Sequence, residues 1–462
     1  MLTQDFLHAN VAFPFFCRPR KPSRNTTSPF HAMWAILALA MLATKAFAFG
    51  RRSIPPQKVD GPWQVEHGEF AQLIDHNNPS LGTFQQSYWY NYHFYQGPGS
   101  PIVLFSPSHW NGTDGIGFIF NVTTMGRMAQ ELGGAAINIE HRYCAVMQAL
   151  DPFWQYFVRI EEGMARNCSK DVVAVVDHID DILLHGSAQD ITDLKAKFNL
   201  QSVKHNDDFV NQIGYAPGLW QEGDESDNHL FLTWCDYIEN VNSTIAGPEG
   251  VGVEKALDGY ARWWKDFGQA ISGCPDDDTA AECYDSHNAS APIYTDVSMG
   301  LRTNRPYTWL NCATPLGTWQ TGAPAGCPSL VSRLIDADYW HRICGLYFPP
   351  TPSGETYNQG RTVDDTNAFT GGWNPQNISR VLFVEGEFDP WASAGVTSQF
   401  RPGGPMESSE NVTVLVLPGG HHCTEQYTPV GGGKAIEDIE KTIDQAVAQI
   451  VKWVGEWPGR QE

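Results

Sequence analysis

The stretch VLFVEGEFDPW at residues 381–391 decides the fold of this chain. Four consecutive apolar residues are typical of a strand buried on both faces of a parallel sheet, and this strand runs into a glycine-containing loop that carries Asp389. A second stretch of the same kind, VTVLVLPGGHH at residues 412–422, ends in two histidines. Functional groups lie beyond the carboxyl ends of the strands in open parallel sheets, so the two stretches predict a site that contains an acid and a histidine.

Earlier segments predict the rest of the sheet. Residues 83–91 (TFQQSYWYN) alternate as expected for the edge strand of an antiparallel hairpin. Residues 102–105 (IVLF) form an apolar run typical of a central strand buried on both faces. A helix over 125–132 and a strand over 136–139 follow. Strand, helix and strand make one βαβ unit, so the predicted fold class is α/β.

The middle of the chain has a different character, with many Cys, Trp and Gly residues and few strand signals, which indicates a helical insertion held by disulfides. One helix is predicted over 171–184, capped by Ser169 and stopped at Gly186, and a final helix over 436–454 is expected to pack on the sheet. The predicted organisation is an N-terminal extension with a signal peptide at 1–48, a core built from 60–144 and 366–457, and a helical cap domain at 145–365.

Residues 33–48 have the features of a secretory signal peptide. A short apolar run is followed by the small-x-small pattern of Ala46-Phe47-Ala48, which a signal peptidase cuts. The run is too short to span a bilayer, since that takes roughly 20 apolar residues. The basic residues ahead of it belong either to an unusually long leading region or to an extension that precedes a true start at Met33. A buried N-terminal helix is the alternative.

Glycosylation sequons and cysteines also favour the secretory route. Asn-x-Ser/Thr sequons follow the signal segment at Asn111, Asn121, Asn167, Asn242, Asn288, Asn377 and Asn411. Of the 10 cysteines, all but Cys17 lie beyond that segment, and the odd number that remains leaves one thiol without a partner. Their spacing matches no metal site, so disulfides are preferred over zinc, and no cofactor or metal is expected. The predicted destination is extracellular, with a vacuolar or lysosome-like compartment as the alternative.

The charge of the chain argues against two classes of partner. The net charge is -22, from 52 acidic and 30 basic residues. Such a surface repels the phosphates of nucleic acids and of anionic membranes. We therefore expect no nucleic-acid partner, and no membrane contact beyond the signal peptide.

The two strand ends match the acid and the histidine of a catalytic triad. In α/β-hydrolases the triad follows the chain order Ser, then Asp or Glu, then His. Asp389 and His422 occupy the last two places. The acid would orient the imidazole, and the imidazole would take the serine proton and return it to the leaving group. The alternatives are a turn merely capped by Asp389, a histidine satisfied in the core, and a register in which His421 takes the place of His422.

Several motifs resemble those of a known family. They are DHNNP at 75–79, TFQQSYW at 83–89, EHRY at 140–143, FWQYF at 153–157, NCSKDV at 167–172, DPW at 389–391 and GHH at 420–422. On these motifs the chain resembles the prolyl carboxypeptidase and dipeptidyl peptidase II family of serine peptidases, and more closely its fungal secreted prolyl endopeptidases. The resemblance implies cleavage of proline-containing peptides through an acyl-enzyme, by an α/β-hydrolase core under a helical cap, with Asp389 as the acid and His422 as the base.

The chain departs from the family pattern in one decisive place. In the family a helix, a strand and a Gly-Gly-Ser-Tyr-x-Gly turn stand between His-Arg-Tyr and the FWQYF region, whereas here only CAVMQALDP at 144–152 separates them. No serine of the chain lies in Gly-x-Ser-x-Gly. Ser108 is the only serine near the expected pocket, but it follows a different strand from the one that leads into the nucleophile turn of the family. At roughly 30 residues per βαβ unit, about two units are missing. The core is therefore expected to be incomplete. Glu385 also stands where the family usually has an Asn, directly before the glycine of the loop that carries the acid.

Three functions remain open on the sequence. The first is that the gene encodes an active proline-directed serine peptidase and that this chain is a mis-spliced or mis-predicted product of it, with the loss between Tyr143 and Ala145. The second is an inactive secreted glycoprotein that binds proline-containing peptides, since Asp and His without the serine form no covalent intermediate. The third is an esterase, because the same fold and triad serve other substrates.

Overall fold

The computed structural model describes most of the chain from residue 65 onward. The described ranges are 65–106, 112–113, 115–140, 148–223, 229–240, 246–268, 271, 280–283, 285–297, 305–426 and 434–457. Several predicted features lie outside them, namely the signal segment at 33–48, the sequons at Asn111 and Asn242, Ser108, and the junction between Tyr143 and Ala145.

The N-terminal part of the chain forms a four-stranded sheet in the order β1-β2-β4-β3. Its strands are β1 (Val65–Leu73), β2 (Thr83–Asn91), β3 (Ile102–Phe105) and β4 (Ala135–Ile139). β2 pairs antiparallel with both β1 and β4, and β3 pairs parallel with β4. The prediction of an edge strand at 83–91 is therefore wrong, because β1 covers that side of β2 and is itself the edge.

The predicted βαβ unit is present. α1 (Thr124–Glu131) connects β3 to β4, after the short 3-10 helix η2 (Ile116–Ile119). The hydroxyl of Thr123 caps α1 by accepting a hydrogen bond from the Gly126 N–H. Trp89, Ile119, Ala129 and Ala136 form a small apolar core between the helix and this sheet.

β3 lies at the free edge of the sheet and is largely exposed, which contradicts the prediction of a central strand buried on both faces. Ile102 is 61% exposed and Leu104 is 58% exposed. Within the described part of the chain, β4 is the one strand that pairs with β3. The run has the composition of a central strand and lacks the neighbour that would bury it. An apolar strand with an open edge is a template for pairing with another chain.

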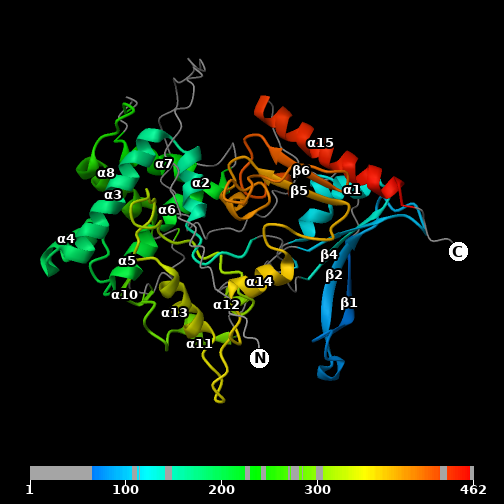
Figure 1. Cartoon of the computed structure of the whole chain (residues 1–462), viewed down its shortest axis with the longest axis horizontal. Coiled ribbons are helices and arrows are strands. Elements are labelled where there is room, and N and C mark those ends of the chain that lie inside the picture. The colour runs from blue at the N-terminus through cyan, green and yellow to red at the C-terminus, as the bar shows by residue number, and fades with distance from the viewer. Residues whose placement is uncertain are drawn as a thin grey trace, which may run out of the picture.

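The C-terminal strands form a second, two-stranded sheet. β5 (Val381–Gly386) and β6 (Val412–Leu417) pair in parallel, as predicted from their sequences. The final helix α15 (Lys434–Gly455) runs alongside these strands (Figure 1). Its Ile439, Ile443 and Val447 pack on Leu417 of β6, which confirms the predicted packing of this helix on the sheet.

Helices rather than strands connect the two sheets. Met128 of α1 packs into the cluster between α15 and β6. On the surface, Arg127 of α1 forms an ion pair with Asp444 of α15. In the described residues no hydrogen-bonded ladder joins β3 to β5, so the parallel sheet is interrupted between them.

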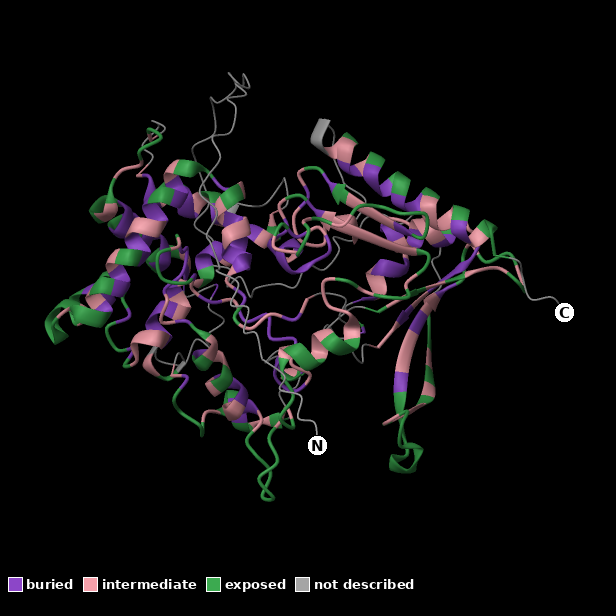
Figure 2. Ribbon diagram, in the orientation of Figure 1, coloured by how far each residue is buried: buried purple, intermediate pink, exposed green. Residues whose placement is uncertain are grey.

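The chain between these sheets is helical and contains the largest core. The helices are α2 (Gln155–Gly163), α3 (Arg166–His185), α4 (Ala188–Lys197), α5 (Asn206–Ile213), α6 (Tyr215–Gly218), η3 (Leu219–Glu222), α7 (His229–Ile238), α8 (Val253–Trp263), η4 (Trp264–Gly268), α10 (Ala280–Cys283), α11 (Pro292–Thr295), α12 (Arg305–Ala313), α13 (Ala337–Tyr347) and α14 (Val363–Thr370). Figure 2 shows buried residues along the inner faces of these helices. The largest fully buried side chains of this core include Trp234, Trp263, Tyr260, Phe153, Phe198, Phe209 and Phe231.

α3 corrects one detail of the sequence analysis. It begins at Arg166, so Ser169 lies buried within the helix instead of capping it. The helix ends where predicted, directly before Gly186. The start was misplaced because Ala165, the residue at the cap position, makes no side-chain cap and gives no local signal.

Disulfides cross-link helices of the helical part, as predicted. Cys168 of α3 is bonded to Cys235 of α7, and Cys312 of α12 is bonded to Cys344 of α13. Cys327 is also disulfide-bonded. Cys423 keeps a free thiol. None of the described helices is both long and apolar enough to cross a bilayer.

We expect Leu104→Lys to change the free energy of unfolding by less than about 1 kcal/mol, because this side chain is mostly in solvent. The same variant should lower self-association, since a charge on an edge strand opposes pairing with a second chain. Urea denaturation and light scattering measure the two effects. Ile160→Ala, a change in the fully buried core, is the control and should cost about 2–5 kcal/mol. An equally large loss for Leu104→Lys would contradict the exposed edge.

Candidate active site

The loops that follow β5 and β6 are joined by backbone hydrogen bonds. The Glu387 N–H donates to the Leu417 carbonyl at 2.9 Å, and the Phe388 N–H donates to the Gly420 carbonyl at 2.8 Å. Gly386 permits this approach, because a Cβ at that position would lie 2.4 Å from the His421 carbonyl oxygen. The two predicted site loops therefore leave the sheet side by side.

This arrangement brings Asp389 and His422 together. The Nδ1 atom of His422 lies 3.0 Å from Oδ2 and 3.2 Å from Oδ1 of Asp389. Asp389 is buried, and His422 is partly exposed. Asp389 also caps η6 (Pro390–Ala394), its Oδ1 accepting a hydrogen bond from the Trp391 N–H at 2.8 Å. The carboxylate thus both caps the start of η6 and lies within hydrogen-bonding distance of the imidazole.

His421 points to different partners. Its Nδ1 lies 2.8 Å from the carbonyl oxygen of Trp220, and its ring packs against the rings of Trp220 and Phe388. The imidazole that faces Asp389 is therefore that of His422.

Gln221 of η3 is hydrogen-bonded to His422 and to two residues beside the Asp389–His422 pair. Its Oε1 accepts hydrogen bonds from the Tyr156 hydroxyl at 2.9 Å and from the Trp391 indole N–H at 2.8 Å. Its backbone carbonyl accepts from the His422 N–H at 3.3 Å. The FWQYF motif contributes packing as well, since Phe153 and Tyr156 both contact the Trp391 ring. Sequence reasoning missed Gln221, which lies in no motif and far along the chain from its partners.

Charge and burial have opposing effects on the pKa of the His422 imidazole. Burial alone would lower the pKa of His422, but the adjacent Asp389 carboxylate outweighs it by charge and by hydrogen bonding and holds this pKa well above its ordinary value. Burial raises the pKa of nearby Glu425 to about 7, with Asp389 adding to the effect and His422 opposing it. Burial also raises the pKa of the Cys423 thiol, which a hydrogen bond with His422 lowers in part. In mildly acidic solution the imidazole of His422 is therefore protonated.

Glu385, near the end of β5, anchors the segment that follows η6. Its carboxylate accepts hydrogen bonds from the Val396 and Thr397 N–H groups and from the Thr397 hydroxyl. Burial raises its pKa, against the effect of these donors. The residue that departs from the family pattern thus holds the chain that follows η6.

The described serines near Asp389 are engaged with the backbone. The Ser393 hydroxyl donates to the Pro390 carbonyl at 2.6 Å, and the Ser398 hydroxyl donates to the Ser393 carbonyl at 2.7 Å. Both side chains are buried. In the part of the chain that the structure describes, no serine hydroxyl is hydrogen-bonded to the His422 ring.

The chain just after the predicted gap is firmly held near this site. The Gln148 N–H donates to the Ala394 carbonyl at 2.9 Å. Asn367 clamps the next residue, because its side chain accepts from the Ala149 N–H and donates to the Ala149 carbonyl. The first described residues after the predicted junction therefore lie beside η6.

The parallel β5 and β6 strands with an acid and a histidine at their carboxyl ends, beside a βαβ unit and a helical region, define an α/β protein of the α/β-hydrolase type. Comparison with family models gives the particular family. Residues 144–432 match the family Peptidase_S28, described as serine carboxypeptidase S28. The chain belongs to this family of serine peptidases, which confirms the resemblance seen in its motifs.

Three relatives illustrate the similarity. The serine protease vicPa of Bipolaris victoriae is 30% identical over 478 residues, which cover 84% of this chain and 88% of that protein. The serine protease vicPb of the same fungus is 28% identical over 479 residues, with the same coverage. A probable extracellular serine carboxypeptidase of Arthroderma benhamiae is 25% identical over 339 residues, which cover 68% of this chain and 45% of that protein.

We expect Asp389→Asn to lower the pKa of His422, because burial then acts without the opposing carboxylate. The asparagine still accepts from the Trp391 N–H, so the turn stays capped. A raised histidine pKa stabilises the fold fully below the unfolded value of about 6.5, and this contribution is lost as the pH rises through the folded pKa. The variant should therefore lose more stability at pH 6 than in alkaline solution.

NMR titration of the imidazole protons measures the pKa, and thermal unfolding across the same pH range measures the stability. His341→Ala, at a histidine paired with Asp151, is the control and should leave the His422 titration unchanged. An unchanged His422 pKa in Asp389→Asn would show that the carboxylate does not set it.

Proposed function

We propose that this chain comes from a gene for a secreted serine peptidase that cleaves next to proline, and that the chain as written lacks the block that carries the nucleophile. Asp389 is the acid that orients the imidazole, and His422 is the general base. The observation that carries the proposal is the Asp389–His422 pair, which is assembled at 3.0 Å while the sequence offers no Gly-x-Ser-x-Gly turn.

Two further observations support a lost block. The alignment with vicPa runs over 478 residues, more than the 462 of this chain, yet it takes in only 84% of the chain, so the relative has residues in the aligned region without a counterpart here. The sheet is interrupted between β3 and β5, and the apolar side chains of Ile102 and Leu104 in β3 lie in solvent. A strand with its turn and helix, inserted after Tyr143, would supply both the nucleophile and the missing neighbour of β3.

We also propose the division into a core at 60–144 and 366–457 and a cap at 145–365, with a proline-containing peptide bound between them. Secretion is supported by the extracellular relative and by the disulfides. Glycosylation is best supported at Asn288, Asn377 and Asn411, whose side chains are exposed. The side chains of Asn121 and Asn167 are partly buried and hydrogen-bonded, so their modification would have to displace a partner.

The decisive experiment has two arms, transcript sequencing and an activity assay. We expect a message with an in-frame block between the codons for Tyr143 and Ala145 that encodes Gly-x-Ser-x-Gly. We expect the 462-residue chain to release no chromophore from a proline-linked chromogenic peptide, and the longer product to do so. Asp389→Asn or His422→Ala in the longer product should lower kcat by a factor of about 10⁴ or more.

Two results would overturn the proposal. One is the absence of any longer message. The other is turnover by the 462-residue chain that His422→Ala abolishes, because the nucleophile would then lie in this chain. Tight binding of the peptide without turnover, with no longer message, would instead establish the inactive peptide-binding protein.

A further inference from the structure

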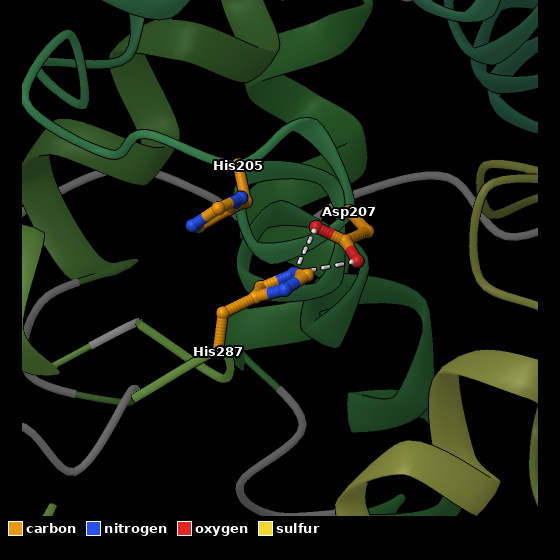
Figure 3. A group of neighbouring side chains, drawn as sticks. All are labelled: His205, Asp207 and His287. Atoms are coloured by element: carbon orange, nitrogen blue, oxygen red, sulfur yellow. Dashed lines mark hydrogen bonds and ion pairs between the residues drawn. The ribbon is translucent and has the colours of Figure 1, made fainter. Parts of the chain in front are cut away.

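Three potential metal ligands meet in the helical part of the chain, on elements other than those that carry Asp389 and His422. His205 directly precedes α5, Asp207 lies in the first turn of that helix, and His287 lies in the loop after α10 (Figure 3). One ligand atom from each of the three lies within 4.8 Å of the others. The Nε2 atom of His287 is 3.1 Å from Oδ2 and 3.3 Å from Oδ1 of Asp207.

The ligand types select a class of metal. Two imidazole nitrogens and one carboxylate oxygen suit zinc and its transition-metal neighbours, whereas calcium and magnesium take oxygen ligands. Three protein ligands leave a fourth tetrahedral position for water or an anion. We propose that His205, Asp207 and His287 bind one Zn²⁺ ion.

One of the three ligands has to move to complete a tetrahedral site. Ligand atoms around a tetrahedral Zn²⁺ ion lie about 3.3 Å apart, which follows from metal–ligand distances near 2.0 Å. The Asp207 and His287 atoms already have this spacing. The wider separation therefore involves His205, whose ring has to turn toward the ion; its side chain is 38% exposed and makes no cap hydrogen bond to α5.

The neighbours of the cluster hold the ligands in place. Arg342 Nη2 donates to Asp207 Oδ2 at 2.6 Å, and the Asp208 N–H donates to Oδ1 at 2.9 Å, which fixes the plane of the carboxylate. The His287 N–H donates to Asp285 Oδ1 at 3.0 Å, which fixes the backbone of the loop. Bonds of this kind orient the ligands of metal sites.

Binding requires the His205 ring to turn out of its stack with the His287 ring, because an imidazole coordinates a metal through a nitrogen lone pair in the plane of the ring. The rings of His205 and His287 stack with centroids 3.7 Å apart and planes inclined by 20°. Arg342 compensates one carboxylate, and Asp285 supplies a second one 3.9 Å from His205 Nε2, near Lys204. The ion would join the start of α5 to the loop at His287 and so brace the helical part.

The test uses the full chain, stripped with a chelator and then titrated with Zn²⁺ in a calorimeter. We expect one equivalent to bind, and the melting temperature to rise with the Zn²⁺ concentration. Mg²⁺ should produce neither effect. The variants His205→Ala, His287→Ala and Asp207→Asn should each weaken binding by at least about tenfold, and His341→Ala, another partly exposed histidine paired with an aspartate, should not.

Co²⁺ titration gives an independent readout, because a tetrahedral site shows intense visible absorption that a histidine on an open surface does not. Circular dichroism of the variants without metal checks that they remain folded. Binding that His205→Ala and His287→Ala leave unchanged would overturn the proposal, and so would a stoichiometry of zero. Neither result bears on the peptidase assignment, since Asp389 and His422 are on other elements.

Discussion

The site depends on the parallel pairing of β5 with β6. Because the strands run in the same direction, their carboxyl ends meet at one edge and the loops that follow are hydrogen-bonded to each other. Gly386 is essential to this approach, since the loop of His421 passes where a side chain would stand. Asp389 and His422, which are 33 residues apart in the chain, reach hydrogen-bonding distance as a result.

The helical part supports this edge through a few polar contacts. Gln221 accepts hydrogen bonds from both Tyr156 and Trp391, and His421 lies against Trp220. His421 thereby contacts the helical part, and His422 contacts Asp389. The same contacts explain why the FWQYF and DPW motifs occur together, since their aromatic rings pack on each other.

In the interrupted sheet, the local sequence and the tertiary context disagree. The strand β3 has side chains suited to burial on both faces and finds one strand neighbour in the described residues. Its exposure costs hydrophobic stabilisation, roughly 25 cal/mol for each Å² of apolar surface left in water. The helical core, which has its own disulfides and its own buried aromatic residues, does not depend on that strand.

The sequence by itself determined the elements whose signals are local. The apolar runs placed β3, β5 and β6, helical periodicity placed α15, and chain order singled out Asp389 and His422. Only the tertiary structure decided which strands are edges, because burial depends on neighbours that are distant in sequence: β2 lies inside the sheet and β3 does not. For the same reason the sequence did not reveal Gln221 or the cluster of His205, Asp207 and His287. The residues that meet there come from separate segments and share no spacing that a sequence pattern could reveal.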